Sequence, residues 1–239
     1  MNGRNRSSFG HQRQPVFCPP LEDGLLVFIE DTGEVYHANY LWIWYMLLAV
    51  QAFTCQSSRM KELPLAKAFM LIEPGPVTLV TTAVGRKKNI MTISWTLVMD
   101  FTPKLGFVTG AWNHSFHALM QTKECVIAIP SVDMAETVVG IGTCSGADTD
   151  KFREFGLTPA KAKVVKAPLI AECIANIECR VIDYVKKHDL FVLEGVRAWI
   201  DPDSHKRRTF HAVGDGTFVA DGRKMNLRAL MAEKIPPGA

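Results

Sequence analysis

The sequence predicts a mainly β protein in which a closed or partly closed antiparallel barrel carries a few peripheral helices. After residue 60, most segments alternate apolar and polar residues with the period of a strand. These strands follow one another through short turns, which favours antiparallel pairing, and helical segments occur only in the connections. The chain contains neither GxGxxG nor GxxxxGK[ST], so a doubly wound nucleotide-binding fold is not expected.

Composition and charge indicate a globular protein with a small ligand. The 239 residues are 48% hydrophobic and 21% charged, and a net charge of +3 is too small to predict a nucleic-acid partner, although it suits a small anion. The six cysteines are Cys18, Cys55, Cys125, Cys144, Cys173 and Cys179. They show neither CxxC nor metal-ligand spacing, so we predict reduced thiols, no metal site and a cytoplasmic location.

The N-terminal part is predicted to be an extension, residues 1–59, upstream of a domain at 60–239. Residues 1–35 are polar and predicted to be irregular, whereas 40–55 contain an apolar run at 41–50. A membrane span needs roughly 20 such residues, so a span is not expected. Three interpretations remain open: a non-native start upstream of Met60, an anchor or export signal, and a helix packed on the domain or a partner.

The first strands of the domain surround a basic turn. Residues 75–84 form a strand after a Pro-Gly-Pro turn, and 85–89 ("GRKKN") form a hairpin turn. The chain returns through one strand at 89–101 ("NIMTISWTLVMDF"), and 105–112 form a third strand. Small hydrogen-bonding residues interrupt the apolar pattern of 89–101, which indicates either a solvated face or an edge that holds a polar ligand.

Three helices and a hairpin follow. A helix is expected at 115–124 with Ser115 as its N-cap, and a buried strand at 125–130. A second helix with a Ser start occupies 131–142, and a third at 148–156 is capped by Asp148 or Thr149 and closed by Gly156. Residues 173–185 and 189–201 form a long hairpin around "KKH". The tail from 206 has one short strand, and His188 and His205 are expected to be solvated.

Two polar clusters are candidate ligand sites. Asn113, His114, Ser115 and His117 surround a helix N-terminus, where free N–H groups and the dipole favour an anion. The alternative is a Ser cap with two surface histidines. Residues 142–152 combine small residues with Lys151, which is either a ligand-closing loop or a flexible loop before a helix. We find no nucleophile–base pair and predict no catalytic side chain, as expected where a cofactor carries the chemistry.

The motifs resemble those of the flavin reductase-like family, the FMN-binding split barrels. Residues 89–119 resemble its flavin-binding segment with Asn-x-Met-Thr-x-Ser, and 144–152 resemble its Ser-Gly-x-x-x-Asp-Lys-Phe motif. Residues 186–200 resemble a later hairpin of the family, with His188 and Asp189 in reversed order. The resemblance covers roughly residues 73–218 and implies an antiparallel split β-barrel of the FMN-binding type.

The resemblance also implies a set of cofactor-binding residues. The strand would lie along the flavin, the turn would hold its phosphate, and the second loop would close over it. The residues are Asn89, Met91, Thr92, Ile93, Ser94, Trp95, Asn113, His114, Ser115, His117, Ser145, Gly146 and Lys151. For Trp95, a ring contact and a core position remain equal alternatives. The turn lacks the Arg or Lys often found there, so its histidines would make phosphate affinity pH-sensitive.

The function implied is that of an NAD(P)H-dependent flavin reductase with FMN as cofactor, FAD being possible. It would be a homodimer with flavin near the subunit interface, supplying reduced flavin to a monooxygenase or another acceptor. Two alternatives stay open: a flavoredoxin-like FMN electron carrier, and a flavin-binding sensor module.

Overall fold

The computed structural model describes residues 25–29, 35–39, 60–236 and 238. The chain divides into two compact units, residues 1–54 and 55–239. In the first unit, β1 (Leu25–Ile29) and β2 (Val35–Asn39) form an antiparallel pair. The expectation that residues 1–35 are irregular throughout is therefore wrong at β1. The apolar segment 40–55 lies outside the described residues. No helix in the described part of the chain has the length and apolar character needed to cross a bilayer.

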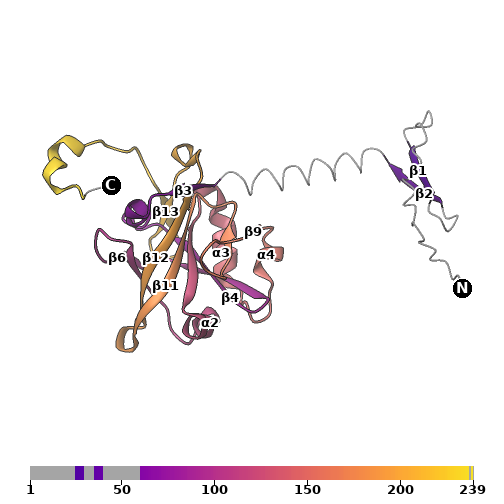
Figure 1. Cartoon of the computed structure of the whole chain (residues 1–239), viewed down its shortest axis with the longest axis horizontal. Coiled ribbons are helices and arrows are strands. Elements are labelled where there is room, and N and C mark those ends of the chain that lie inside the picture. Colours follow the sequence, from indigo (N-terminus) through magenta and orange to yellow (C-terminus); the bar gives the residue numbers. More distant parts are fainter. Residues whose placement is uncertain (1–24, 30–34, 40–59, 237, 239) are drawn as a thin grey trace, which may run out of the picture. The chain divides into compact units, whose positions relative to one another are not determined.

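The second unit contains an eight-stranded antiparallel sheet that curls into a split barrel, as predicted (Figure 1). Its path runs β5-β4-β8-β11-β12-β7-β6, and β3 also pairs with β12. The strands are β3 (Lys61–Leu63), β4 (Thr78–Val84), β5 (Lys87–Ile93), β6 (Thr96–Val98), β7 (Lys104–Val108), β8 (Glu124–Ile129), β11 (Ala175–Val185) and β12 (Leu190–Ile200). Strand β12 is the hub of the sheet because it pairs with β11, β7 and β3.

The two strands at the edges of the sheet follow each other directly in the sequence. Strands β5 and β6 stand at opposite ends of the path and are joined only by Ser94 and Trp95. The carbonyl of Trp95 accepts a hydrogen bond from Val108 N–H at 3.0 Å, which fastens this corner to the end of β7. The single strand predicted for 89–101 is therefore wrong: the chain leaves one edge at residue 94 and crosses to the other. Among the strands that the structure describes, none pairs with the other edge of β5.

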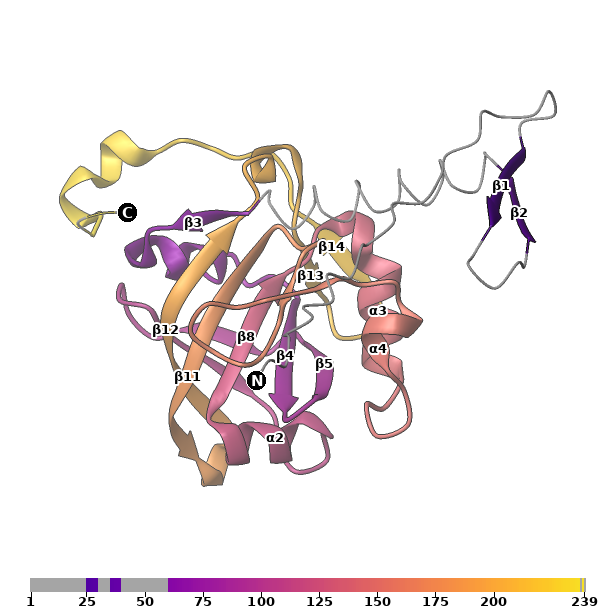
Figure 2. The same cartoon turned by 45° about the vertical axis from the view of Figure 1, so that its right-hand side comes forward.

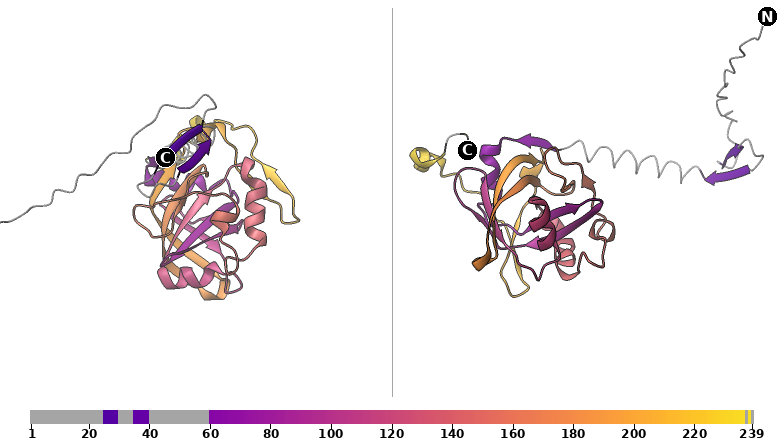
Figure 3. Two further views of the ribbon diagram at one scale, coloured as in Figure 1. Left: turned by 90° about the vertical axis from the view of Figure 1, so that its right-hand side faces the viewer. Right: turned by 60° about the horizontal axis from the view of Figure 1, so that its bottom comes forward.

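Helices flank the free edge of β5. The helices α2 (Ser115–Thr122), α3 (Ala135–Thr143) and α4 (Lys151–Glu154) all pack against β5, and α2 also packs against β4. Figure 2 shows α2 at one end of the curled sheet and α3 and α4 along its flank. Two further views agree with this arrangement (Figure 3). The edge of β5 thus runs between α2 on one side and the α3–α4 connection on the other.

Strands β4 and β5 are buried on both faces because each face meets a different core. Val80, Met91 and Ile93 point into the barrel core, whereas Leu79 and Ile90 belong to the core beneath α3 and α4. Thr92 lies on the α3 face, where its Oγ1 donates to the carbonyl of Val138 at 2.7 Å. This bond ties β5 to α3 and fixes one wall beside the edge.

Two predicted helix caps are wrong. His114, not Ser115, occupies the N-cap of α2, and it makes no side-chain capping bond. Ser115 is instead buried and accepts a hydrogen bond from Asn89. Helix α4 is capped by Asp150, whose carboxylate accepts from Arg153 N–H, rather than by Asp148 or Thr149. Gly156 closes this segment as predicted, with φ of +61°, a value that favours glycine.

Smaller elements complete the unit. The 131–142 segment begins with a 3-10 turn, η2 (Val132–Met134), before α3. The remaining elements are η1 (Leu65–Leu71), β9 (Pro159–Ala160), β10 (Leu169–Ile170), η3 (Lys186–His188), η4 (Ser204–Lys206), β13 (Phe210–Ala212), β14 (Phe218–Ala220) and η5 (Arg228–Lys234). The tail therefore holds a hairpin, β13–β14, where one strand was predicted. His188 and His205 are exposed as expected, and Cys125, Cys173 and Cys179 are buried free thiols.

Candidate functional site

Three adjoining cavities follow β5 along its free edge. The tryptophan cavity, about 190 Å³, lies beside Ser94, Trp95 and Trp112. The lysine cavity, about 380 Å³, shares Thr92, Trp112 and Asn113 with it and contains Lys151. The basic cavity, about 700 Å³, shares Asn89, His114 and Gly146 with the lysine cavity and extends to Arg86, Lys87 and Lys88. We call this series the β5 groove.

All thirteen predicted cofactor residues line the β5 groove. Ile93, Ser94 and Trp95 line the tryptophan cavity, and Thr92 and Asn113 line both this cavity and the lysine cavity. The lysine cavity also holds Met91, Ser145 and Lys151; the basic cavity holds Ser115 and His117; and Asn89, His114 and Gly146 lie at the junction of the two. The structure thus brings together three sequence segments that span more than sixty residues.

Asn89 and Thr82 place two unpartnered polar atoms at the groove. They are cross-strand partners on β5 and β4, and they are 8% and 1% exposed. Asn89 Nδ2 donates to Ser115 Oγ at 2.8 Å, but neither Asn89 Oδ1 nor Thr82 Oγ1 has a hydrogen-bond partner within the described residues. Buried polar atoms are almost always satisfied, so this pair indicates a ligand group or water in the junction.

Two glycines allow the 142–146 loop to lie directly on β5. A Cβ at Gly146 would stand 2.0 Å from Asn89 Oδ1, closer than any real contact. A Cβ at Gly142 would stand 3.3 Å from Thr92 Cβ, which is tight. Any side chain at position 146 would displace Asn89 or the loop, and glycine is therefore the residue that this close approach requires.

Lys151 supplies a buried cation to the lysine cavity. The residue is 5% exposed, and its Nζ donates to the carbonyl of Ile141 at 2.7 Å. An ammonium has three donors, so two remain for a ligand. Burial lowers the pKa of Lys151 below its ordinary value, while the nearby Cys144 acts in the opposite direction. An anionic or carbonyl ligand group would compensate this buried charge.

The first turn of α2 borders the junction. Ser115 N–H donates to Asn113 Oδ1 at 3.2 Å, so the side chain of Asn113 partly satisfies the helix N-terminus. His114 and His117 are exposed on the rim of the basic cavity. The arrangement can attract an anion through the helix dipole and through either imidazole when it is protonated.

Two exposed tryptophans flank the outer end of the groove. Trp95 is 65% exposed and Trp112 is 69% exposed, so the core alternative for Trp95 is wrong. The ring of Trp112 folds over Gly110, where a Cβ would lie 2.2 Å from it. Large exposed aromatic side chains beside a cavity are suited to contact a planar ligand or a partner protein.

The basic turn is the main part of the site that the sequence did not reveal. Arg86, Lys87 and Lys88 line the basic cavity together with His114 and His117, whose segment 113–117 contains no Arg or Lys. Their adjacency to Asn89 in the chain was the available indication, because a hairpin turn lies at the end of the strand that it closes. Trp112, Cys144 and Asp148 also line the groove without having been predicted.

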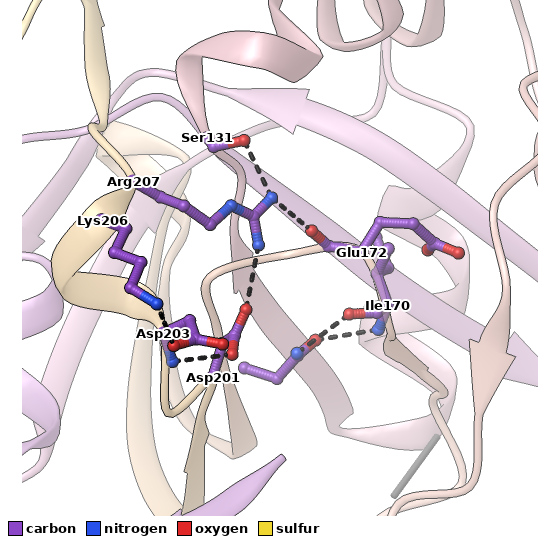
Figure 4. A network of polar contacts seen from close by, with 8 residues as sticks. Ser131, Ile170, Glu172, Asp201, Asp203, Lys206 and Arg207 are labelled. Atoms are coloured by element: carbon purple, nitrogen blue, oxygen red, sulfur yellow. Dashed lines mark hydrogen bonds and ion pairs between the residues drawn. The ribbon is translucent and has the colours of Figure 1, made fainter. Parts of the chain in front are cut away.

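A further cavity, about 460 Å³, has a structural character. Arg207 donates to Ser131 Oγ at 2.9 Å and to the Glu172 carbonyl at 2.7 Å, and it contacts the Asp201 carboxylate at 3.4 Å (Figure 4). The guanidinium is thus used to join three chain segments.

Comparisons with known proteins cover the part of the chain that contains the β5 groove. A family model described as "Flavin reductase like domain" matches residues 70–214. An Archaeoglobus fulgidus protein is 38% identical over 111 residues, 45% of this chain, and the match spans 63% of that protein's length.

Two solved structures share the fold. The FMN-binding domain of a flavin reductases-like enzyme from Shewanella baltica is 27% identical, with a TM-score of 0.65 over 70% of this chain and 96% of that one. Flavoredoxin from Desulfovibrio vulgaris is 24% identical, with a TM-score of 0.58 over 64% and 89%.

Proposed function

Because the chain belongs to the flavin reductase-like family, we propose that it binds FMN in the β5 groove and acts as an NAD(P)H-dependent flavin reductase. The observation that carries the proposal is the groove itself: the thirteen family-motif residues line one continuous series of cavities. Asn89 Oδ1 and Thr82 Oγ1 have no hydrogen-bond partner within the described residues, and Lys151 has donors left over, so all three can bind a polar ligand there. The FMN-binding domain from Shewanella baltica supports the choice of cofactor.

The residues present fit such a cofactor, whose ring would supply hydride and electron transfer when bound. The free edge of β5 offers backbone donors and acceptors along the groove. Trp95 and Trp112 would exclude water from the outer end, and Ser94 leaves room for a ring between them. Lys151 would favour negative charge on the group beside it, because its own charge is held in a water-poor interior. The helix α2 N-terminus, with His114 and Ser115, would hold the phosphate.

A direct assay separates this function from its alternatives. The full chain is purified, its visible spectrum is recorded, and NADH and NADPH oxidation is followed with FMN, FAD and riboflavin. Steady oxidation with free FMN is the expected result. Tightly bound flavin without that turnover would instead support an electron carrier, for which flavoredoxin offers a fold precedent. A protein that takes up no flavin on titration would overturn the proposal and leave a binding module for another ligand.

We also propose that the protein forms a homodimer through β6 and passes reduced flavin to an acceptor such as a monooxygenase. Trp95, Leu97, Met99 and Phe101 alternate along this edge, and they are 65%, 36%, 44% and 59% exposed. Leu97 lies in β6 (Thr96–Val98) and the other three flank it at every second position, and four exposed large apolar side chains in such a stripe indicate an interaction surface. Trp95 also lines the tryptophan cavity, so a partner on this stripe would stand next to the flavin. The free described cysteines suit a cytoplasmic setting.

Sedimentation of a charge variant tests the dimer. Met99→Glu places a carboxylate in the stripe and should shift the protein toward monomer. Ile182→Glu changes an equally exposed apolar residue on β11, 50% exposed, and should leave the oligomeric state unchanged. If the parent is monomeric, or if both variants dimerise alike, the stripe is not a homodimer interface. The acceptor is sought separately, by transfer of electrons to a purified monooxygenase component.

A further inference from the structure

The basic cavity is larger than a flavin phosphate requires. The groove follows β5 from Ser94 to Lys87, about 23 Å at the usual rise per strand residue. The tryptophan and lysine cavities, about 190 and 380 Å³, offer room for the ring and the ribityl chain. The basic cavity, which includes His114 and Ser115 of the proposed phosphate site, adds about 700 Å³. Cavities of this size hold whole small-molecule ligands rather than a single phosphate.

The lining of the basic cavity carries three cations without protein partners. Arg86, Lys87 and Lys88 are exposed, and none of them forms an ion pair with a residue that the structure describes. Arg86 lies in the two-residue turn between β4 and β5, and Lys87 and Lys88 begin β5, so their positions are set by a hairpin anchored at Thr82 and Asn89. Such a cluster of cations at the end of a groove attracts a phosphate or diphosphate.

Carboxylate and apolar groups share the same cavity. Asp148 and Thr149 line the same cavity as the cations, and the side chain of Asp148 has no hydrogen-bond or ion-pair partner among the described residues. Pro159 is exposed and adds apolar surface, and Phe152, 6% exposed, borders the cavity from the core beneath α3 and α4. A carboxylate suits the hydroxyls of a ribose, as it does in dinucleotide sites, and apolar surface suits the face of a base. Phosphate, sugar and base chemistry are thus all represented.

The unpartnered atoms of Asn89 and Thr82 favour a ligand that extends from the lysine cavity into the basic cavity. Asn89 Oδ1 can only accept a hydrogen bond, whereas Thr82 Oγ1 can donate one. A hydroxyl group satisfies both requirements at once, and a phosphate oxygen cannot donate to Asn89 when it is ionised. The two atoms, which line the basic cavity, therefore match a hydroxyl group of a polyol or sugar in a ligand that also carries charged groups.

We propose that the basic cavity is an adenylate subsite, which binds the adenosine phosphate half of a dinucleotide. This inference rests on the proposed flavin function, because the groove that leads into the cavity is the flavin groove. Two sources share this chemistry: the AMP half of FAD, joined to the flavin through the groove, and the adenosine half of NAD(P)H. Arg86, Lys87 and Lys88 bind the phosphates, and Asp148 binds the ribose.

The test compares flavins of different length on one charge variant. Dissociation constants for riboflavin, FMN and FAD are measured by fluorescence quenching, and KM for NADH and NADPH is measured at saturating FMN. In Arg86→Gln/Lys87→Gln/Lys88→Gln, we expect FAD affinity or nicotinamide KM to worsen about tenfold, since three exposed ion pairs are removed. FMN should change less than about threefold and riboflavin should not change. Asp148→Asn should weaken the same dinucleotide without altering FMN.

A matched control removes three charges elsewhere. Lys161, Lys163 and Lys166 are exposed and line none of the three cavities of the groove, so their triple Gln variant should leave every ligand unchanged. A loss of affinity confined to FAD identifies FAD as the ligand of the subsite. A rise confined to the KM for NADH or NADPH identifies NAD(P)H as that ligand. Equal losses for FMN and FAD, or no loss for any dinucleotide, would overturn the subsite while leaving flavin binding intact. ADP carries the adenosine phosphate group without a flavin, so its titration into the flavin-free protein tests the subsite separately from the proposed function.

Discussion

Asn89 shows how one residue joins the groove together. Its amide donates to Ser115 on α2, its oxygen lies under Gly146 of the 142–146 loop, and its strand neighbour is Thr82. Three walls of the groove therefore meet at a single side chain. A motif asparagine could be predicted from the sequence, but its bond to Ser115 could not, because 26 residues separate the two. The same separation in the sequence explains why Ser115 was wrongly predicted to be the N-cap of α2.

Ser94 tests whether the corner between β5 and β6 receives the flavin ring. Replacing it by Leu should fill the tryptophan cavity and weaken FMN binding about tenfold or more, because overpacking is costly. The residue is exposed and outside the strands, so the fold should persist. Flavin fluorescence titration measures the affinity, and circular dichroism checks the fold. Ser94→Ala is the conservative control; equal FMN affinity in parent, Ala and Leu proteins would move the ring elsewhere.

His114 and His117 give a second prediction at the same scale. A protonated imidazole attracts the phosphate dianion, so FMN affinity should fall as pH rises from about 6 to about 8. Riboflavin lacks the phosphate and should change much less. The phosphate's own ionisation near pH 6 acts in the opposite direction.

The control is therefore His114→Gln/His117→Gln, in which the histidine-dependent fall, about threefold, should disappear. Identical pH curves for FMN in parent and double variant would make both histidines plain surface residues.

At the scale of elements, the hairpin β13–β14 is held by one histidine and one carboxylate. His211 Nδ1 lies 3.0 Å from the Gly75 carbonyl, and its Nε2 lies 2.6 Å from Asp221. Burial acts to raise the pKa of Asp221, but hydrogen bonds from Thr209 and His211 outweigh it, and the pKa is lowered below its ordinary value. A carboxylate with a lowered pKa stabilises the fold above its unfolded-state pKa, and this stabilisation is lost as pH falls through the folded-state value.

We therefore expect Asp221→Asn to reduce the free energy of unfolding at pH 7, with the difference from the parent shrinking as pH falls toward 3. Urea unfolding at several pH values measures this. Asp215→Asn in the loop of the same hairpin is the control, since the Asp215 carboxylate accepts from Thr217, two residues along the chain, and its loss should have a smaller effect. A difference that stays constant or grows on acidification would contradict the assignment.

Most elements were predictable because they depend on local pattern. The apolar character of β4, the pattern of β11 and β12 and the hairpin between the last two are visible in the sequence. The break at Ser94 and Trp95 was not, because it reflects closure of the barrel rather than the preference of either residue. The turn predicted at 85–89 is confined to Gly85 and Arg86, because β5 begins at Lys87. Its place beside the α2 N-terminus depends on how α2 packs on β4 and β5.

At the scale of the whole molecule, the groove belongs entirely to the second unit. Its lining runs from Thr82 to Pro159, and residues 1–54 form a separate unit. We predict that a chain starting at Met60 binds FMN as tightly as the full chain and stays soluble. Fluorescence titration of both proteins at equal concentration measures this. Loss of flavin binding on truncation would show that the extension contributes to the site.

The pairing of β12 has a consequence for synthesis on the ribosome. Strands β3, β7 and β11 all pair with β12, which spans residues 190–200 and is the last long strand to be synthesised. A nascent chain that ends before it carries every groove residue yet leaves apolar strands without their partner. Contacts between residues 61–63 and 198–200 must then close the longest loop of the sheet, a slow event. During translation, the growing chain needs protection from aggregation until β12 has left the exit tunnel.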